Sequence, residues 1–224
     1  MTDSPADPPH TDLPTRARTL AVELHAGQVR KGTDTSYVAG HLDPVADLVR
    51  GAGGTDLQVA AAYLHDAAED AGGRLTLERI ANEVDPHVAD LVAALSDSLV
   101  DTTETTTKLP WLDRKPAYVA KLAGEPDEVL EISVADKLHN ARSLLADYRD
   151  GGPDTWARFN EQRPEYQLWY YETLSETFRH RLPDRPLAVA MVECLAEIRD
   201  RVRVDVPDID ARVAAAFADM ARRS

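Results

Sequence analysis

Apolar residues recur at helical spacing along most of this chain, and no other feature of the sequence constrains its fold more. In one segment, for example, Val134, Leu138 and Ala141 fall on a single face of a helix. No segment combines β-branched residues with the period-two alternation that is typical of strands. The sequence therefore predicts an all-α protein.

Prolines and glycines divide the periodic sequence into about ten helices, because chains leave or enter helices at such residues. We expect a mobile loop at residues 99–110, the least periodic stretch inside the chain. The helices are predicted near residues 15–31, 43–52, 56–70, 76–84, 87–97, 112–123, 127–149, 164–181, 186–203 and 208–222.

The domain organisation follows from the absence of any Gly- or Ser-rich linker between two halves of the sequence, which predicts a single domain. Residues 1–14 hold four prolines and three aspartates and are expected to form a disordered tail. Residues 15–182 form the main domain. The helices of residues 183–224 either complete its core or form a subunit contact, so the oligomeric state stays open.

Composition excludes several classes of protein. With 39 acidic and 25 basic residues among 224, the chain has a formal net charge of −14, which argues against nucleic acid or an anionic membrane as partner. No stretch approaches the roughly 18 apolar residues of a membrane span. The single cysteine, Cys194, cannot form an internal disulfide. These properties favour a cytoplasmic location.

The first candidate cluster of functional residues is AAAYLHDAAED at 60–70, where an apolar run leads into four ionisable residues. On one continuous helix His65 and Glu69 would be i,i+4 neighbours, and so would Asp66 and Asp70. Three carboxylates so close together repel one another unless they are solvated, protonated or offset by a cation. Imidazole and carboxylate are good ligands for divalent metals. The alternative is a frayed acidic helix end.

The second cluster is VADKLHNARSLL at 134–145. Asp136, Asn140 and Ser143 form a polar line at i, i+4 and i+7 beside the apolar stripe. A carboxylate and an amide in such a helix need partners. They belong either to an internal hydrogen-bond network or to a site shared with the first cluster.

The third cluster is HAGQVRKGT at 25–33, followed by Tyr37 and His41. His25 falls on the apolar side of its predicted helix and favours a structural role. Arg30 and Lys31 are expected to end that helix at Gly32, where positive charge suits the negative end of the helix dipole. His41 precedes a new helix and is either an exposed turn residue or a metal ligand.

Together these stretches, with WLDRKPAYVAKL at 111–122, resemble the HD-domain phosphohydrolases. The finer detail resembles the alarmone hydrolase branch, which includes the hydrolase domains of the RelA/SpoT enzymes. The resemblance spans roughly residues 15–180. It implies a single helical HD-type fold over the main domain and a nucleotide as substrate.

The resemblance also implies roles for individual residues. His41, His65, Asp66 and Asp136 match the ligands of one divalent metal, usually manganese. Glu69 and Asp70 match an acidic pair credited with water activation and proton transfer. The residues that match substrate-binding positions are Arg30, Lys31, Asn140 and Ser143.

One position departs from the family pattern. The family has two residues between the tyrosine and the histidine of this motif, whereas here Val38, Ala39 and Gly40 separate Tyr37 from His41. Because glycine tolerates backbone angles that other residues avoid, we expect a bulge at Gly40 to absorb the extra residue.

The activity that the resemblance implies is removal of the 3′-pyrophosphate from guanosine tetra- or pentaphosphate by a metal-dependent hydrolase. A bound metal would supply a nucleophile near neutral pH and positive charge for the phosphate oxygens. The same chemistry on an adenosine alarmone or on the 2′-phosphate of NADPH is an alternative. So is a catalytically silent protein that binds an alarmone.

Overall fold

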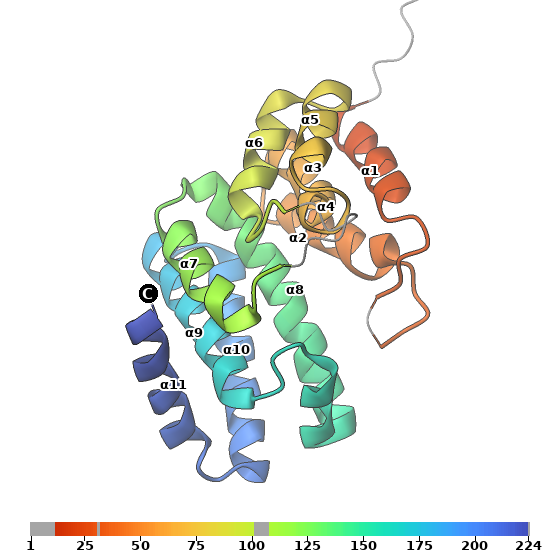
Figure 1. Ribbon diagram of the computed structural model, residues 1–224. Helices are drawn as coiled ribbons and strands as arrows, with labels where there is room; N and C mark the ends of the chain where they lie inside the picture. The colour runs from red at the N-terminus through yellow and green to blue at the C-terminus, as the bar shows by residue number, and fades with distance from the viewer. Residues whose placement is uncertain (1–11, 31, 101–107, 224) are drawn as a thin grey trace, which may run out of the picture.

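The computed structural model describes residues 12–30, 32–100 and 108–223, and it has the all-α architecture that the periodicity predicts (Figure 1). The elements are α1 (Leu13–Leu24), the π-helix η1 (Val38–Leu42), α2 (Asp43–Gly51), α3 (Asp56–Leu64), α4 (Ala67–Asp70), α5 (Arg74–Glu83), α6 (Pro86–Leu95), α7 (Trp111–Ala123), α8 (Asp127–Gly151), the 3₁₀-helix η2 (Gly152–Arg158), α9 (Pro164–Arg181), α10 (Pro186–Asp205) and α11 (Ile209–Arg223).

Helix α8 is the element around which the others are arranged. In Figure 1, α1 to α6 lie toward one end of the molecule and α7 and α9 to α11 toward the other, with α8 extending between them. It packs against α2, α3 and α6 on one side and against α9 and α10 on the other. Its apolar stripe is buried, since Val134, Leu138 and Ala141 are each at most 1% exposed. Because α8 is 25 residues long, this one helix can pack against both groups of helices, α1 to α6 at one end and α7 and α9 to α11 at the other.

Eight of the ten predicted helices agree with observed helices to within two residues at each end. The first exception is the predicted helix 15–31, which ends at Leu24. Gly27 then takes a left-handed conformation with φ of 78°, which helices do not accommodate. Residues 25–30 and 32–36 consequently lie outside any helix, and an isolated antiparallel bridge joins Val29 to Ser36. The prediction that Arg30 ends a helix was wrong, and Lys31 lies outside the described residues.

The second exception is the predicted helix 56–70, which divides at His65 and Asp66 into α3 and α4. The imidazole Nδ1 of His65 hydrogen-bonds the carbonyl oxygen of Ala62 at 2.7 Å. That oxygen is the acceptor that the next helical turn would use, so the side chain competes with the helix. The single continuous helix expected over residues 56–70 was therefore wrong, although Asp66 and Asp70 keep the expected i,i+4 spacing, since the amide of Asp70 donates to the carbonyl oxygen of Asp66 at 3.0 Å.

Most of the expected tail, residues 1–11, and residues 101–107 of the expected loop lie outside the described part of the chain. The C-terminal helices are described throughout: α10 packs on α8 and α9, and α11 packs on α9 and α7. Among the described helices, none combines the length and the apolar content that crossing a bilayer requires.

Candidate functional site

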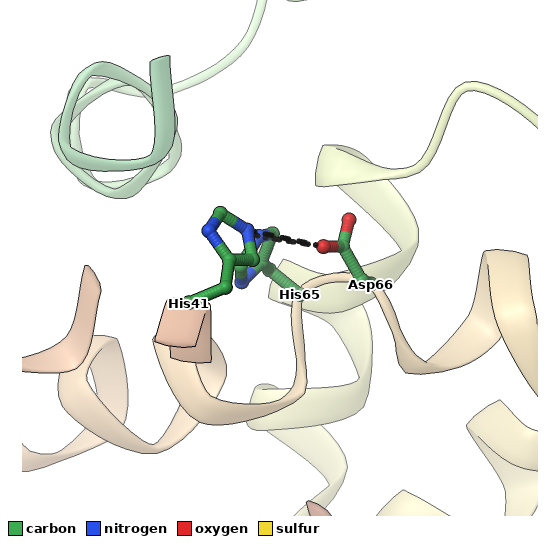
Figure 2. Close-up of side chains that lie close together, drawn as sticks. All are labelled: His41, His65 and Asp66. Atoms are coloured by element: carbon green, nitrogen blue, oxygen red, sulfur yellow. Dashed lines mark hydrogen bonds and ion pairs between the residues drawn. The ribbon is translucent and has the colours of Figure 1, made fainter. Parts of the chain in front are cut away.

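Four side chains from three separate parts of the chain meet at one point. His41 comes from the π-helix η1, His65 and Asp66 come from the break between α3 and α4, and Asp136 comes from the middle of α8. Figure 2 shows the side chains of His41, His65 and Asp66 pointing toward one another. His41, His65 and Asp136 are each at most 5% exposed. At the break between α3 and α4, the neighbouring residues His65 and Asp66 therefore both join this cluster.

The donor atoms of this cluster converge closely. The Nε2 atoms of His41 and His65 lie 3.2 Å apart. Asp66 Oδ2 lies 3.3 Å from Nε2 of His41 and 3.1 Å from Nε2 of His65. Asp136 Oδ1 lies 3.4 Å and 3.6 Å from the same two nitrogen atoms.

These separations fit a divalent metal. With metal–ligand bonds of about 2.1 Å, as in zinc sites, neighbouring ligand atoms lie about 3.0–3.4 Å apart. The hydrogen bond from His65 Nδ1 to Ala62 fixes the ring and leaves Nε2 facing the cluster, as in metal sites. Two imidazole nitrogens and two carboxylates also form a donor set that divalent first-row metals accept. The residues present can therefore hold the metal that the motifs predict.

The charges of the cluster lead to the same conclusion. Burial by itself lowers the pKa of His65. The negative charges of Asp66 and Asp136 raise this pKa by more than burial lowers it, so it lies well above its usual value. Burial raises the pKa of Asp66, yet the neighbouring histidines pull it well below its usual range. The two carboxylates thus stabilise positive charge between them, which a proton or a bound cation can supply.

Two further side chains hold the candidate ligands in place. Tyr37 Oη donates a 2.5 Å hydrogen bond to Asp66 Oδ2. His139 Nδ1 lies 3.0 Å from His41 Nδ1. Burial, followed by the charges of His41 and Arg30, lowers the pKa of His139 to about 4. His139 is therefore neutral near pH 7 and can accept the Nδ1 hydrogen of His41, which leaves Nε2 free to bind a metal.

The extra residue before His41 is absorbed by a π-helix. The amide of Asp43 donates to the carbonyl oxygen of Val38, five residues earlier. Gly40 is not in the left-handed region, so the expected reason for a glycine there was wrong. A Cβ at Gly40 would instead lie 3.1 Å from Cβ of Arg30 and 3.3 Å from Cγ2 of Thr35. Glycine thus permits the close approach of the loop that carries Arg30.

Glu69 and Asp70 lie in α4, directly after the candidate ligands. Glu69 Oε1 accepts the backbone N–H of Asp97 at 2.8 Å, and Lys108 Nζ lies 3.3 Å from Glu69 Oε2. Burial, followed by the charges of Asp97 and Asp66, raises the pKa of Glu69 to about 7. Burial and Asp66 also raise the pKa of Asp70, which accepts a hydrogen bond from Gln28. A carboxyl group with a pKa near 7 can both accept and donate a proton at neutral pH.

A cleft of about 670 Å³ lies beside the cluster. Three of its lining residues hydrogen-bond the candidate ligands, namely Tyr37 to Asp66 and both Lys137 and Asn140 to Asp136. The charged residues among its described lining are Arg30, Lys115, Lys137, Arg158 and Asp147. Three of the four cations are paired with carboxylates, Lys115 with Asp97, Lys137 with Asp136 and Arg158 with Asp147. Arg30 bonds the neutral amide of Asn140 instead, so its charge makes the cleft suited to an anion, although the whole chain is acidic.

The structure brings three of the four predicted substrate-binding residues to this cleft. Arg30, Asn140 and Ser143 all line it, and Arg30 donates a 2.7 Å hydrogen bond to Asn140 Oδ1. Asn140 Nδ2 in turn donates to Asp136 Oδ1 at 2.6 Å. Arg30 is thereby connected to a candidate metal ligand through a single amide. The fourth residue, Lys31, lies outside the described part of the chain.

Sequence reasoning assigned no role at the site to Tyr37, His139 or Asp97, and it counted Lys137 only among the cations of the motif segments without choosing it. Tyr37 and His139 lie in or beside the quoted motifs, so their positions could have marked them as candidates. Asp97 lies outside every motif, and it reaches Glu69 only because the end of α6 packs near α4.

Comparison with known proteins adds a family. The HD domain family matches residues 17–163, which is more than half of the chain. A protein of Synechocystis sp., named probable guanosine-3′,5′-bis(diphosphate) 3′-pyrophosphohydrolase, is 32% identical over 131 residues, which cover 58% of this chain and 16% of that protein. A probable GTP pyrophosphokinase of Mycobacterium leprae is 33% identical over 58% of this chain and 15% of its own length. The chain thus spans less than a fifth of these two relatives.

A human protein matches along nearly its whole length. It is named guanosine-3′,5′-bis(diphosphate) 3′-pyrophosphohydrolase MESH1, and it is 28% identical over 77% of this chain and 94% of its own. Among solved structures, lmo0812 from Listeria monocytogenes has a TM-score of 0.59 at 27% identity, covering 70% of this chain and 97% of its own. A metazoan ortholog of SpoT, whose structure is described as that of a protein that hydrolyses ppGpp, has a TM-score of 0.60 over 88% of this chain and 98% of its own. At 19% identity the latter shows a shared fold.

Proposed function

The chain belongs to the HD domain family, and from this premise we propose that it is a metal-dependent hydrolase that removes the 3′-pyrophosphate from guanosine tetra- or pentaphosphate. The observation that carries the proposal is the convergence of two histidines and two aspartates beside a cationic cleft. The names of the Synechocystis and human relatives, both guanosine-3′,5′-bis(diphosphate) 3′-pyrophosphohydrolases, support the choice of substrate.

His41, His65, Asp66 and Asp136 are the residues that would hold the metal, and Mn²⁺ is the ion we propose. A divalent cation at this point supplies positive charge for phosphate oxygens and makes nearby water more acidic. Tyr37 and His139 orient two of the ligands through the hydrogen bonds described above.

The cleft residues would bind the nucleotide. Arg30 and Lys137 present cations to phosphate oxygens, while Asn140 and Ser143 offer an amide and a hydroxyl group. Trp111 and Tyr170 lie in the same wall with ring centroids 5.6 Å apart and offer aromatic surface to a base. A ligand with one aromatic group and several negative charges suits this combination.

Glu69 is proposed as the proton carrier and Asp70 as its neighbour in the acidic pair. Because the pKa of Glu69 is raised to about 7, its carboxylate can take a proton from attacking water and return it within one turnover. Asp70, which Gln28 holds at 3.1 Å, orients the water.

The first test of this proposal is a hydrolysis assay. We expect the full chain loaded with Mn²⁺ to release pyrophosphate from guanosine tetraphosphate and the chelator-treated protein to release none. Asp66→Ala is expected to lose both bound metal and turnover, because it removes a donor atom that lies within 3.3 Å of both histidine nitrogens. Asp47→Ala, at a 71% exposed side chain on α2, is the matched control and should keep both.

A nucleotide panel at equal concentration tests the substrate. It contains the guanosine alarmone, an adenosine alarmone and NADPH, and we expect the highest kcat/KM for the guanosine compound. A higher kcat/KM for the adenosine alarmone or for NADPH would support a hydrolase with that compound as its substrate. Alarmone binding without product after prolonged incubation with metal would overturn the catalytic proposal in favour of a binding protein.

A further inference from the structure

We propose that Asp97 is a positioning residue that forms, with Glu69, a pair of carboxyl groups sharing one proton: Asp97 stays the anion and Glu69 carries the proton. This inference rests on the proposed function, in which Glu69 transfers a proton during hydrolysis. Nothing in the motifs assigns a role to Asp97, which follows α6 and lies 28 residues from Glu69 in the chain.

The geometry of the pair is fixed from the backbone. The amide N–H of Asp97 donates to Glu69 Oε1 at 2.8 Å, so the start of the segment after α6 holds one oxygen of the carboxyl group in place. Only 2% of the Asp97 side chain is exposed, so water cannot screen its charge from Glu69.

Two cations from α7 fix Asp97 as the anion of the pair. Asp97 Oδ2 accepts hydrogen bonds from the Arg114 guanidinium and, at 2.7 Å, from Lys115 Nζ. These cations hold the pKa of Asp97 well below its usual range despite its burial. Oδ1 of Asp97 is buried, and no hydrogen-bond donor among the described residues reaches it. A protonated Glu69 carboxyl group is the donor that this oxygen lacks.

The charged groups around Glu69 come from several elements. Asp66 and Asp70 flank it on its own segment, and Lys108 Nζ, just before α7, lies 3.3 Å from its Oε2. The charge of Lys115 in α7 also acts on Glu69, and the charge of Glu69 in turn raises the pKa of Tyr170 in α9. Burial and the negative charges of Asp97 and Asp66 raise the Glu69 pKa, and Lys115 lowers it. The pair therefore holds one proton below neutral pH and releases it near pH 7.

This arrangement suits hydrolysis of a phosphoester. As the oxygen of water bonds to the phosphorus next to the ribose, the bond from that phosphorus to the ribose 3′-oxygen breaks. Glu69 accepts one proton of the water and returns it to the 3′-oxygen. Asp97 raises the proton affinity of Glu69 and aims its carboxyl group, without touching the substrate itself.

The test substitutes Asp97→Asn, which keeps the shape of the side chain and removes its charge. The titration of Glu69 is followed by NMR in protein labelled with ¹³C at the glutamate carboxyl carbons and loaded with Mg²⁺, with Glu69→Gln to assign the resonance. We expect the midpoint of Glu69 to fall by about one pH unit or more, because Arg114 and Lys115 are then left unpaired beside it. With Mn²⁺ bound, the midpoint of the acidic limb in the pH profile of kcat/KM should move to lower pH by the same amount.

Two controls make the result specific. Asp113→Asn changes an aspartate of the same helix as Arg114, with a side chain that is 52% exposed, and should leave both midpoints unchanged. Arg114→Gln removes a cation from the pair and should raise the Glu69 midpoint. It tests the proposal in the opposite direction if Asp97→Asn fails to fold, as judged by circular dichroism.

The outcomes separate this inference from the proposed function. A Glu69 midpoint in the usual glutamate range in the unmodified protein, or one that Asp97→Asn and Arg114→Gln both leave in place, would overturn the pairing. Shifts of the NMR midpoint in a protein that hydrolyses no alarmone would keep the pairing and reject the proposed function.

Discussion

At the scale of single residues, the candidate ligands are themselves held in place by hydrogen bonds to other residues. Each histidine has one ring nitrogen in the cluster and the other in a hydrogen bond, His41 with His139 and His65 with the backbone of Ala62. Such contacts fix the orientation and the tautomer of a ligating imidazole. The hydroxyl of Tyr37 does the same for Asp66.

Tyr37→Phe tests the contribution of such a contact. Removing the hydroxyl leaves the ring in place but frees Asp66 Oδ2, so we expect the affinity for Mn²⁺ to fall by about 10-fold or more. Metal titration calorimetry measures the change. Tyr166→Phe removes a tyrosine hydroxyl that bonds Asp219 far along the chain and should leave the affinity unchanged. Equal affinities in the two variants would contradict the role of Tyr37.

At the scale of elements, two irregular segments build the site: the π-helix η1 and the break between α3 and α4. An extra residue in a regular α-helix would rotate every later side chain by about 100°. The wider turn of η1 accommodates that residue and still directs His41 to the cluster. The close approach of Arg30 to Gly40 couples this turn to the wall of the cleft.

Gly40→Ala tests that coupling. The added Cβ would lie 3.1 Å from Arg30 Cβ, so one of the two segments must move. We expect a loss of about 1–3 kcal/mol in the free energy of unfolding, as for other overpacking substitutions, together with a higher KM for the nucleotide. Urea denaturation and steady-state kinetics measure the two effects.

Gly51→Ala is the matched control for this substitution. Nothing lies within 4 Å of a Cβ at Gly51, so the variant should be neutral or stabilised by up to about 1 kcal/mol. If Gly40→Ala were as stable and as active as Gly51→Ala, steric coupling through η1 would be rejected.

At the scale of the whole molecule, the first of the two C-terminal helices, α10, lies against the helix that carries Asp136, and α11 packs on α9 and α7. Helix α10 packs along α8 and α9 through residues such as Met191 and Ile198, which are both fully buried. We therefore propose that residues 183–224 belong to the core of the domain. In that case the stability of the site depends on helices that lie beyond the matched family region.

Ile198→Ala tests this proposal. It would leave a cavity between α10 and its neighbours, and we expect the free energy of unfolding to fall by about 2–5 kcal/mol. Val189→Ala on the same helix, at a residue that is 48% exposed, should cost about 0.5 kcal/mol or less. Urea unfolding of both variants gives the comparison, and similar losses would show that α10 is peripheral.

The sequence by itself determined the all-α class, most helix boundaries and the residues that meet at the site. Helical periodicity and prolines act between neighbours in the chain, so a linear sequence carries them in full. The resemblance to the HD-domain phosphohydrolases implied that His41, His65, Asp66 and Asp136 form one metal site. In the structure, Asp66 Oδ2 and Asp136 Oδ1 each lie within 3.6 Å of the Nε2 atoms of both histidines.

Only the tertiary structure decided how these residues meet. Three features depend on which segments pack together: the break at His65, the π-helix that contains His41, and the contact between Glu69 and Asp97. A single sequence does not show that Glu69 contacts Asp97, 28 residues away, or that His41 contacts His139, 98 residues away. The helix propensity of residues 56–70 and the i,i+4 spacing of their ionisable residues favoured a continuous helix through His65. Packing and a buried side-chain hydrogen bond outweighed that preference, since a propensity difference is worth less than about 1 kcal/mol per residue.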